Sequence, residues 1–158
     1  MHMIGDFKKY KTGLLLGGQR VLGFDFGEVG IGVAISDAGL VLASPYVRLE
    51  NKSYAELMPK IARIIELESV GLVVIGFPFE MSGREGKAAL KTRAFADTLS
   101  SHLPDIEIVF IDERLTSAAV EKSLVRDLDL SRAKRKQVID KLSAAKILQQ
   151  FLDIMNKD

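Results

Sequence analysis

The chain has no cysteine and no tryptophan, and only two histidines among its 158 residues. Without cysteine it can form no disulfide, no thiolate-ligated metal site and no cysteine nucleophile. With only His2 and His102, a histidine-rich zinc site is disfavoured as well. Any metal site would have to be built from carboxylates, which suit Mg2+ or Mn2+. The lack of cysteine also fits a reducing compartment, and we expect a cytoplasmic protein.

Long apolar runs and a strong net charge are also missing. No apolar run approaches the length of a membrane span, and the leucine run near the start is too brief for a signal peptide. We therefore interpret residues 1–19 as an N-terminal extension. The formal net charge is only +1, so attraction to a polyanion would have to come from a local patch. The length and the 47% hydrophobic content fit a single globular domain, which we place at residues 20–155.

The hydrophobic pattern predicts an α/β protein with one mixed sheet. Short turns join the first three expected strands, which favours antiparallel neighbours. Helices and strands then alternate, which places helices on the faces of the sheet. The expected strands cover residues 20–26, 30–36, 40–49, 70–78 and 106–112, and the expected helices cover 53–68, 85–103, 116–128 and 131–155.

One acid stands in the first expected strand. Alternation puts Leu22 and Phe24 on one face of this strand and Asp25 on the other. Gly23 and Gly27 flank Asp25, and we expect them to leave room for a ligand close to the backbone. The alternative interpretation is that Asp25 is a turn acid that ends the strand.

A second pair of acids follows the last expected strand. Asp112 and Glu113 come at its carboxyl end, where ligands gather in parallel α/β sheets. Because the two are adjacent, they point in different directions, and only one is expected to enter a shared site. Arg114 is expected to pair with the other acid or to contact a phosphate. The alternative is a surface turn with no function.

The third acid lies on the last expected helix. Asp140 shares its face with Ala144, Ile147 and Leu148, so it points toward the body of the protein. An unpaired buried carboxylate costs several kcal/mol, roughly, and a metal ion would remove that cost. A salt bridge would also remove it, with Arg114 as the candidate partner. Together with the two acids at strand ends, Asp140 could hold a pair of Mg2+ ions, the arrangement that cleaves phosphodiesters.

Basic residues cluster at the start of the last expected helix, where a phosphate could bind. Cations at a helix start oppose the helix dipole, but a bound phosphate reverses this penalty. A glycine-rich loop before the helix over 85–103 adds further cations, although its glycine spacing does not match a P-loop. The expected nucleic-acid contacts are Arg84, Lys87, Arg114, Arg132, Lys134, Arg135 and Lys136; the alternative for them is a solvated basic surface.

Four motifs in order resemble the YqgF (RuvX) family of Holliday junction resolvase-like nucleases. They are GFDFGEVGIGVAISD, VIGFPFEMSGREG, FIDERLTSAAVE and SRAKRKQVIDKLSAAKILQQFLD. The resemblance implies a ribonuclease H-like fold, a five-stranded mixed sheet in the order β-β-β-α-β-α-β-α. It implies metal-binding and catalytic roles for Asp25, Glu113 and Asp140. It also implies nuclease action in maturing the 5′ end of 16S ribosomal RNA, or on four-way DNA junctions. Glu28, Val29 and Gly30 stand where the family usually has a threonine and basic residues, so two potential phosphate contacts are missing.

Three classes of function are open. The leading hypothesis is a Mg2+- or Mn2+-dependent nuclease that acts on precursor RNA as a monomer or weak homodimer, with resolution of branched DNA as its alternative. A second class is a phosphotransferase of the actin and sugar-kinase type, but such kinases need two domains around the nucleotide. A third is a non-catalytic ribosome assembly factor, which would not need three converging carboxylates.

Overall fold

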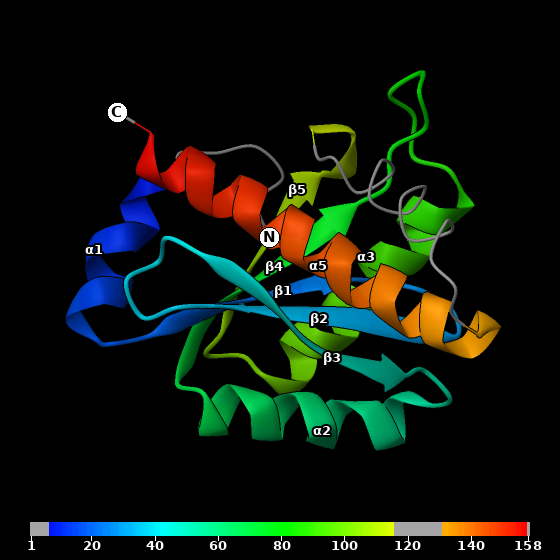
Figure 1. Ribbon diagram of the computed structural model, residues 1–158, viewed down its shortest axis with the longest axis horizontal. Helices are drawn as coiled ribbons and strands as arrows, with labels where there is room; N and C mark the ends of the chain where they lie inside the picture. Colours follow the sequence, from blue (N-terminus) through cyan, green and yellow to red (C-terminus); the bar gives the residue numbers. More distant parts are fainter. Residues whose placement is uncertain (1–6, 116–130, 158) are drawn as a thin grey trace.

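The computed structural model describes residues 7–115 and 131–157. The expected helix over 116–128 therefore lies outside the described residues. Figure 1 shows the elements in chain order. They are α1 Lys8–Leu16, β1 Arg20–Asp25, β2 Gly30–Ser36, β3 Ala43–Glu50, α2 Tyr54–Leu67, β4 Val70–Phe77, α3 Lys87–His102, β5 Glu107–Asp112, the 3-10 turn η1 Glu113–Leu115 and α5 Arg132–Asn156.

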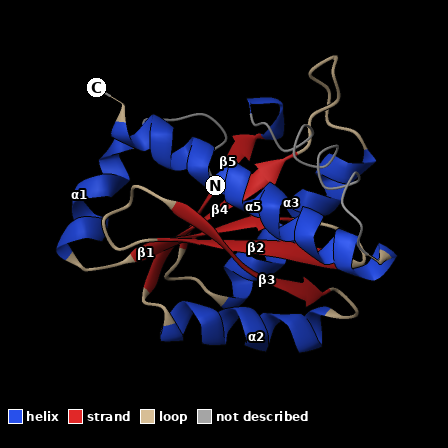
Figure 2. Ribbon diagram, viewed as in Figure 1, coloured by secondary structure: helices blue, strands red, loops and turns tan. Residues whose placement is uncertain are grey.

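The strands form one five-stranded mixed sheet in the spatial order β3-β2-β1-β4-β5. The first three strands pair antiparallel, as their short turns predict. β4 and β5 add in parallel on the other side of β1. The five-stranded α/β sheet that the sequence predicts is confirmed, and Figure 2 shows helices in front of it and behind it.

Two hydrophobic cores lie on the two faces of the sheet. One core joins the sheet to α2 and α3, and its buried side chains include Phe24, Ile61 and Phe95. The other joins the sheet to α5 and to the N-terminal segment, with Leu148 and Phe151 among its buried side chains. α5 crosses the sheet diagonally in Figure 1. Helix α5 thus packs directly on one face of the sheet.

The N-terminal extension contributes to the second core. Its helix α1 has no side-chain cap at its start, so packing rather than capping stabilises it. Phe7 and Leu14 are buried, and the Phe7 ring lies 4.8 Å from the Phe151 ring. No helix in the described ranges is both long enough and apolar enough to cross a membrane.

Glycines allow α5 to lie very close to the sheet. A Cβ at Gly23 would come within 2.7 Å of Leu148 Cβ, and one at Gly32 within 1.9 Å of the Asp140 carbonyl oxygen. The space beside Gly27 is filled by the Gly30 carbonyl oxygen, 2.5 Å from a Cβ placed there. The expectation that Gly23 and Gly27 leave room for a ligand is therefore wrong, because helix α5 and the following turn occupy those spaces.

Candidate functional site

Strand register brings Asp25 and Asp140 to the same face of the sheet. Asp25 is the Cα partner of Gly32 in the antiparallel pair of β1 and β2, and directly opposed residues share a face. Gly32 in turn touches the backbone of Asp140. The aspartate of α5 thus lies over the strand neighbour of the first-strand aspartate, and both are half-buried.

Glu113 reaches the same region from the other side. It follows β5 directly, and its Oε1 lies 2.8 Å from where a Cβ of Gly76 would stand. Gly76 is in β4, the parallel neighbour of β1. The carboxyl ends of the three parallel strands therefore converge at one edge of the sheet, where α/β proteins place their ligands.

Asp25 and Glu113 line a common pocket of ≈ 240 Å³, here called the carboxylate pocket. Its wall also includes Phe26 and Glu28 after β1, and Lys91 and Thr92 of α3. Lys91 donates to Glu28, and both side chains line this pocket. A phosphate entering the pocket would therefore meet the carboxylates of Asp25 and Glu113, with the Glu28–Lys91 ion pair beside them. Lys91 and Thr92 could not be recognised from the sequence, since nothing in their local pattern points to a site.

Asp140 does not line the carboxylate pocket and instead pairs with Arg48. The Arg48 Nε lies 2.7 Å from Asp140 Oδ2, and the two side chains are only 11% and 20% exposed. The expected salt bridge between Asp140 and Arg114 does not form, because Arg114 pairs with Asp112 instead. The Arg48 side chain comes from β3 and crosses over Gly30, where a Cβ would stand 2.2 Å from its guanidinium. Strand alternation could have placed Arg48 on the α5 face, because Leu49 beside it is buried in the opposite core.

The residues fit a divalent cation in part. No group of three histidine, cysteine, aspartate or glutamate side chains close enough for a metal occurs among residues 7–115 and 131–157. Asp25 and Glu113 supply the hard oxygen donors that Mg2+ prefers. Ser143, one turn after Asp140 on α5, has a fully buried hydroxyl, the one buried side-chain polar atom in the described segments without a hydrogen-bond partner.

The acid next to Glu113 has a structural role. Arg114 forms a two-pronged pair with Asp112, with Nη2 to Oδ2 at 2.7 Å, and its guanidinium lies 5.0 Å from the centre of the Phe79 ring. The Arg114 hydrogen bonds hold the pKa of Asp112 below its ordinary value. As expected, only one acid of the adjacent pair lines the site, and Arg114 pairs with the other.

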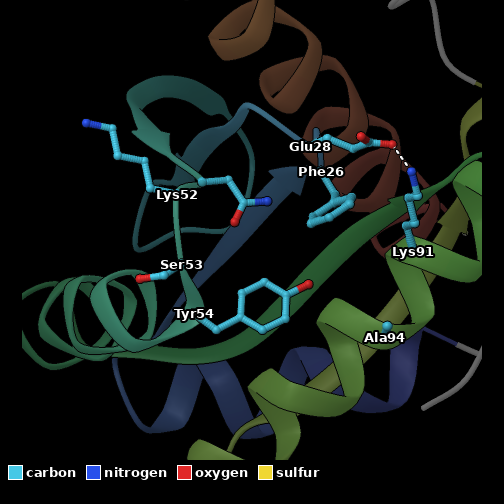
Figure 3. A pocket seen from close by; sticks show the side chains of 8 residues that line it. Phe26, Glu28, Lys52, Ser53, Tyr54, Lys91 and Ala94 are labelled. Atoms are coloured by element: carbon cyan, nitrogen blue, oxygen red, sulfur yellow. Dashed lines mark hydrogen bonds and ion pairs between the residues drawn. The ribbon is translucent and has the colours of Figure 1, made fainter.

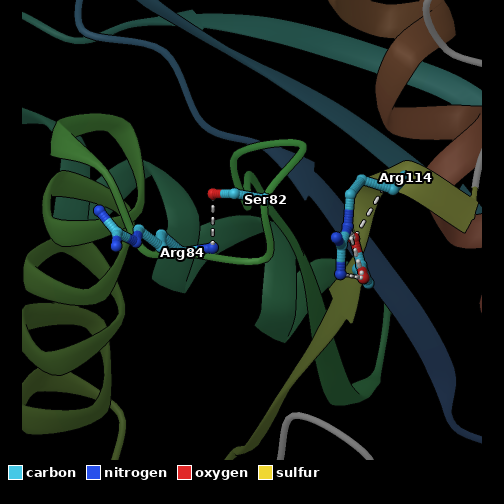
Figure 4. Close-up of polar contacts among 4 residues, drawn as sticks. Ser82, Arg84 and Arg114 are labelled. Carbon is cyan, nitrogen blue, oxygen red and sulfur yellow. Dashed lines mark hydrogen bonds and ion pairs between the residues drawn. The ribbon is translucent and has the colours of Figure 1, made fainter.

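The expected phosphate contacts other than Arg114 come from the loop before α3, the first residue of α3 and the first turns of α5. In Figure 4, Arg84 points away from Arg114, and its backbone N–H donates to the Ser82 hydroxyl. Lys87 is exposed at the first position of α3. The remaining four cations occupy the first turns of α5, behind the N-cap Ser131. Arg132, Lys134 and Lys136 are exposed, and Arg135 is half-buried.

Comparisons with known proteins match most of the chain. The family model RuvX, described as "Holliday junction resolvase", matches residues 19–154. A protein of Gluconobacter oxydans named "Putative pre-16S rRNA nuclease" is 41% identical over 140 residues, 89% of this chain and 87% of that protein. A protein of Caldanaerobacter subterraneus subsp. tengcongensis with the same name is 44% identical over 135 residues, 85% and 96% of the two chains.

A solved structure supports the fold. The T. thermophilus RuvC in complex with its Holliday junction substrate aligns with a TM-score of 0.55 at 13% identity, covering 87% of this chain and 96% of that one. At this identity the likeness shows a common fold, the ribonuclease H-like fold that the four motifs imply.

Proposed function

Because the chain belongs to the RuvX family, we propose that it is a metal-dependent nuclease that hydrolyses phosphodiester bonds during 5′-end maturation of pre-16S ribosomal RNA. The observation that carries this proposal is the convergence of acids from three separate elements. Asp25 and Glu113 line one pocket, and Asp140 lies over the strand partner of Asp25. Such a constellation suits phosphodiester chemistry without histidine or cysteine.

Asp25 and Glu113 would hold Mg2+ or Mn2+ in the carboxylate pocket, and Asp140 would join them after leaving Arg48. Such ions would supply positive charge to stabilise the attacking and leaving oxygens of a displacement at phosphorus. Lys91, released from Glu28, can donate to a phosphate oxygen in this pocket. Arg48, released from Asp140, becomes a second donor at the same edge.

The proposed partner is precursor RNA, with branched DNA as the competing substrate, and the proposed place of action is the cytoplasm, where ribosomal RNA is processed in bacteria. The basic turns of α5 and the loop cations Arg84 and Lys87 would contact phosphates beyond the pocket. Arg114 is the weakest of the seven proposed contacts, because Asp112 and Phe79 already engage it.

We propose a monomer or weak homodimer. Paired cutting of a four-way junction calls for a two-fold dimer with a self-complementary apolar patch. In the described part of the chain the exposed large apolar side chains are spread over several segments, with Leu16 at the end of α1, Val41 after β2, Leu67 in α2 and Met81 after β4. Trimming of an RNA end needs only one active site.

The test of the function is Asp25→Asn. It removes a charge from the pocket while the shape of the side chain stays, so Mg2+-dependent cleavage should be lost and the circular dichroism spectrum kept. Precursor ribosomal RNA, single-stranded RNA and four-way DNA should be offered side by side with Mg2+ or Mn2+. Cleavage at the wild-type rate would remove Asp25 from the metal site, and a tight dimer that selects four-way DNA would overturn the RNA assignment.

A further inference from the structure

A second pocket borders the carboxylate pocket, and nothing in the proposed chemistry uses it. It has a volume of ≈ 390 Å³, within the range of about 300–1,000 Å³ typical of ligand sites. Figure 3 shows Phe26 and Tyr54 in its wall, with Glu28 and Lys91 at one side. Phe26, Glu28 and Lys91 line both pockets. We call it the Phe26–Tyr54 pocket.

Its aromatic wall is held in place from behind. The Phe26 ring stacks on Phe95 at 5.0 Å between centroids and 28° between planes. The Tyr54 ring lies 6.2 Å from the same Phe95, and burial raises the pKa of the Tyr54 hydroxyl. Phe95 itself is fully buried. Two rings fixed in this way lose little freedom when a flat ligand stacks on them, which favours binding.

Polar groups surround the aromatic wall. The Asn51 amide is oriented by its donation to the Gly27 carbonyl at 3.0 Å, so it presents its oxygen in a fixed direction. Lys52 and Lys91 bring positive charge to the rim, where Glu50 and Glu28 pair with them. Aromatic faces, a few oriented polar groups and nearby cations are what proteins use to bind unpaired nucleobases.

We propose that the Phe26–Tyr54 pocket holds the unpaired base of the nucleotide next to the phosphate that is cleaved. This rests on the proposed nuclease function, since the carboxylate pocket must hold that phosphate. The two pockets share Phe26 and the Glu28–Lys91 pair, so a strand with its phosphate in one pocket reaches the other with its neighbouring base. A base in a duplex cannot enter without unpairing, so the pocket selects single-stranded or frayed ends.

The test is a scan of single-stranded RNAs, each with one abasic nucleotide, bound to the full-length wild-type protein with Ca2+, a hard cation that carboxylates also bind, and followed by fluorescence anisotropy. Removal of one stacked base should weaken binding by about 5- to 150-fold at a single position. Tyr54→Leu keeps an apolar side chain against Phe95. It should weaken the binding of RNA that has all its bases by a similar factor. The same variant should then show no further loss with the abasic nucleotide at that position.

The matched control is Tyr46→Leu. Tyr46 is an exposed tyrosine of β3 whose hydroxyl donates to Glu68, and its replacement should leave both affinity and position dependence unchanged. Circular dichroism must show that both variants are folded. A flat abasic scan, or a Tyr54→Leu variant that keeps the position dependence, would overturn the subsite. If Tyr54→Leu lost as much affinity for duplex RNA as for single-stranded RNA, the pocket would bind phosphates rather than a base. That result would also overturn the subsite.

Cleavage of the same RNAs with Mg2+ is measured separately, so the two proposals can fail independently. A position-dependent base effect without cleavage would leave the subsite standing and reject the nuclease. Cleavage with a flat abasic scan would do the reverse.

Discussion

The Arg48–Asp140 pair offers the sharpest test of how the acid of α5 is used. Arg48→Met keeps the aliphatic stem and removes the guanidinium, which leaves the Asp140 carboxylate half-buried without this partner. Breaking a fully buried pair costs about 3–5 kcal/mol, and an exposed pair contributes about 0–1 kcal/mol. With side chains 11% and 20% exposed and a separation of 2.7 Å, we expect a loss of about 2–3 kcal/mol in the free energy of unfolding without metal.

Divalent metal should then reveal the role of Asp140. In the wild type a metal ion must displace Arg48 before Asp140 can bind it, whereas in Arg48→Met the carboxylate is available. Ligand binding stabilises by RT ln(1 + [L]/Kd), about 2.7 kcal/mol at 100 times Kd. We therefore expect Mg2+ or Mn2+ to raise the unfolding free energy of Arg48→Met more than that of the wild type. Urea denaturation with and without metal measures both quantities.

Arg20→Met is the matched control. Arg20 pairs with Glu68 at 3.5 Å, with side chains 39% and 29% exposed, so its loss should cost about 1 kcal/mol or less. Its response to metal should equal that of the wild type. If Arg48→Met lowers the free energy of unfolding no more than Arg20→Met does, the Arg48–Asp140 pair does not stabilise the fold. If metal stabilises the wild type and Arg48→Met equally, Asp140 is not released to bind it.

Three further perturbations test other parts of the site. Ser143→Ala removes a buried hydroxyl without a hydrogen-bond partner. It should raise the free energy of unfolding without metal, measured by urea denaturation, by about 1–3 kcal/mol. A lower free energy of unfolding would mean that the hydroxyl has a partner. Arg114→Gln should destabilise at neutral pH, because the lowered pKa of Asp112 contributes stability above its unfolded-state value. That contribution is lost as the pH falls below about 4, so a destabilisation that persists in acid would contradict this origin. Alanine at the α5 cations should reduce the slope of the logarithm of the RNA-binding constant against the logarithm of salt concentration by roughly 0.7–0.9 per lost contact. Alanine at the exposed α2 cations Lys60 and Arg63 should leave this slope unchanged. An unchanged slope in the α5 variants would show that the start of α5 does not contact RNA.

The sequence predicts the strands and long helices well because their patterns are local. β4 is a continuous apolar run buried at nearly every position, and α5 repeats apolar residues at helical spacing. The helix α1 gives no such signal. It is short, contains Gly13 and lacks a side-chain cap, and the contact of its N-cap residue Phe7 with Phe151 joins segments that are far apart in the chain.

The site is predicted in part for the same reason. Asp25 and Glu113 can be predicted because both come at the carboxyl ends of strands, where α/β proteins bind ligands. The structure brings both to one pocket. The pairing of Asp140 with Arg48 depends on where β3 passes beneath α5. Strand alternation gives the face on which Arg48 lies, but no local pattern gives the position of α5 over that face. The role of Gly32 was also hidden, because a glycine that allows a helix to approach looks the same in sequence as one that admits a ligand.

The Arg48 pair explains how Asp140 can face the protein body before any metal arrives. A half-buried carboxylate without a partner would cost several kcal/mol, roughly, and Gly30 and Gly32 let Arg48 and α5 come close enough to prevent this. The same pair must open when a metal takes Asp140, so metal binding carries the cost of separating it. The affinity of the proposed site is therefore set by Arg48 as well as by its acids. A substrate phosphate that accepts the released guanidinium would lower that cost, so metal and RNA should each strengthen the binding of the other. Titration of Mn2+ into the wild-type protein, with and without a single-stranded RNA whose backbone resists cleavage, would show this coupling. Equal Mn2+ affinities in the two titrations would contradict it.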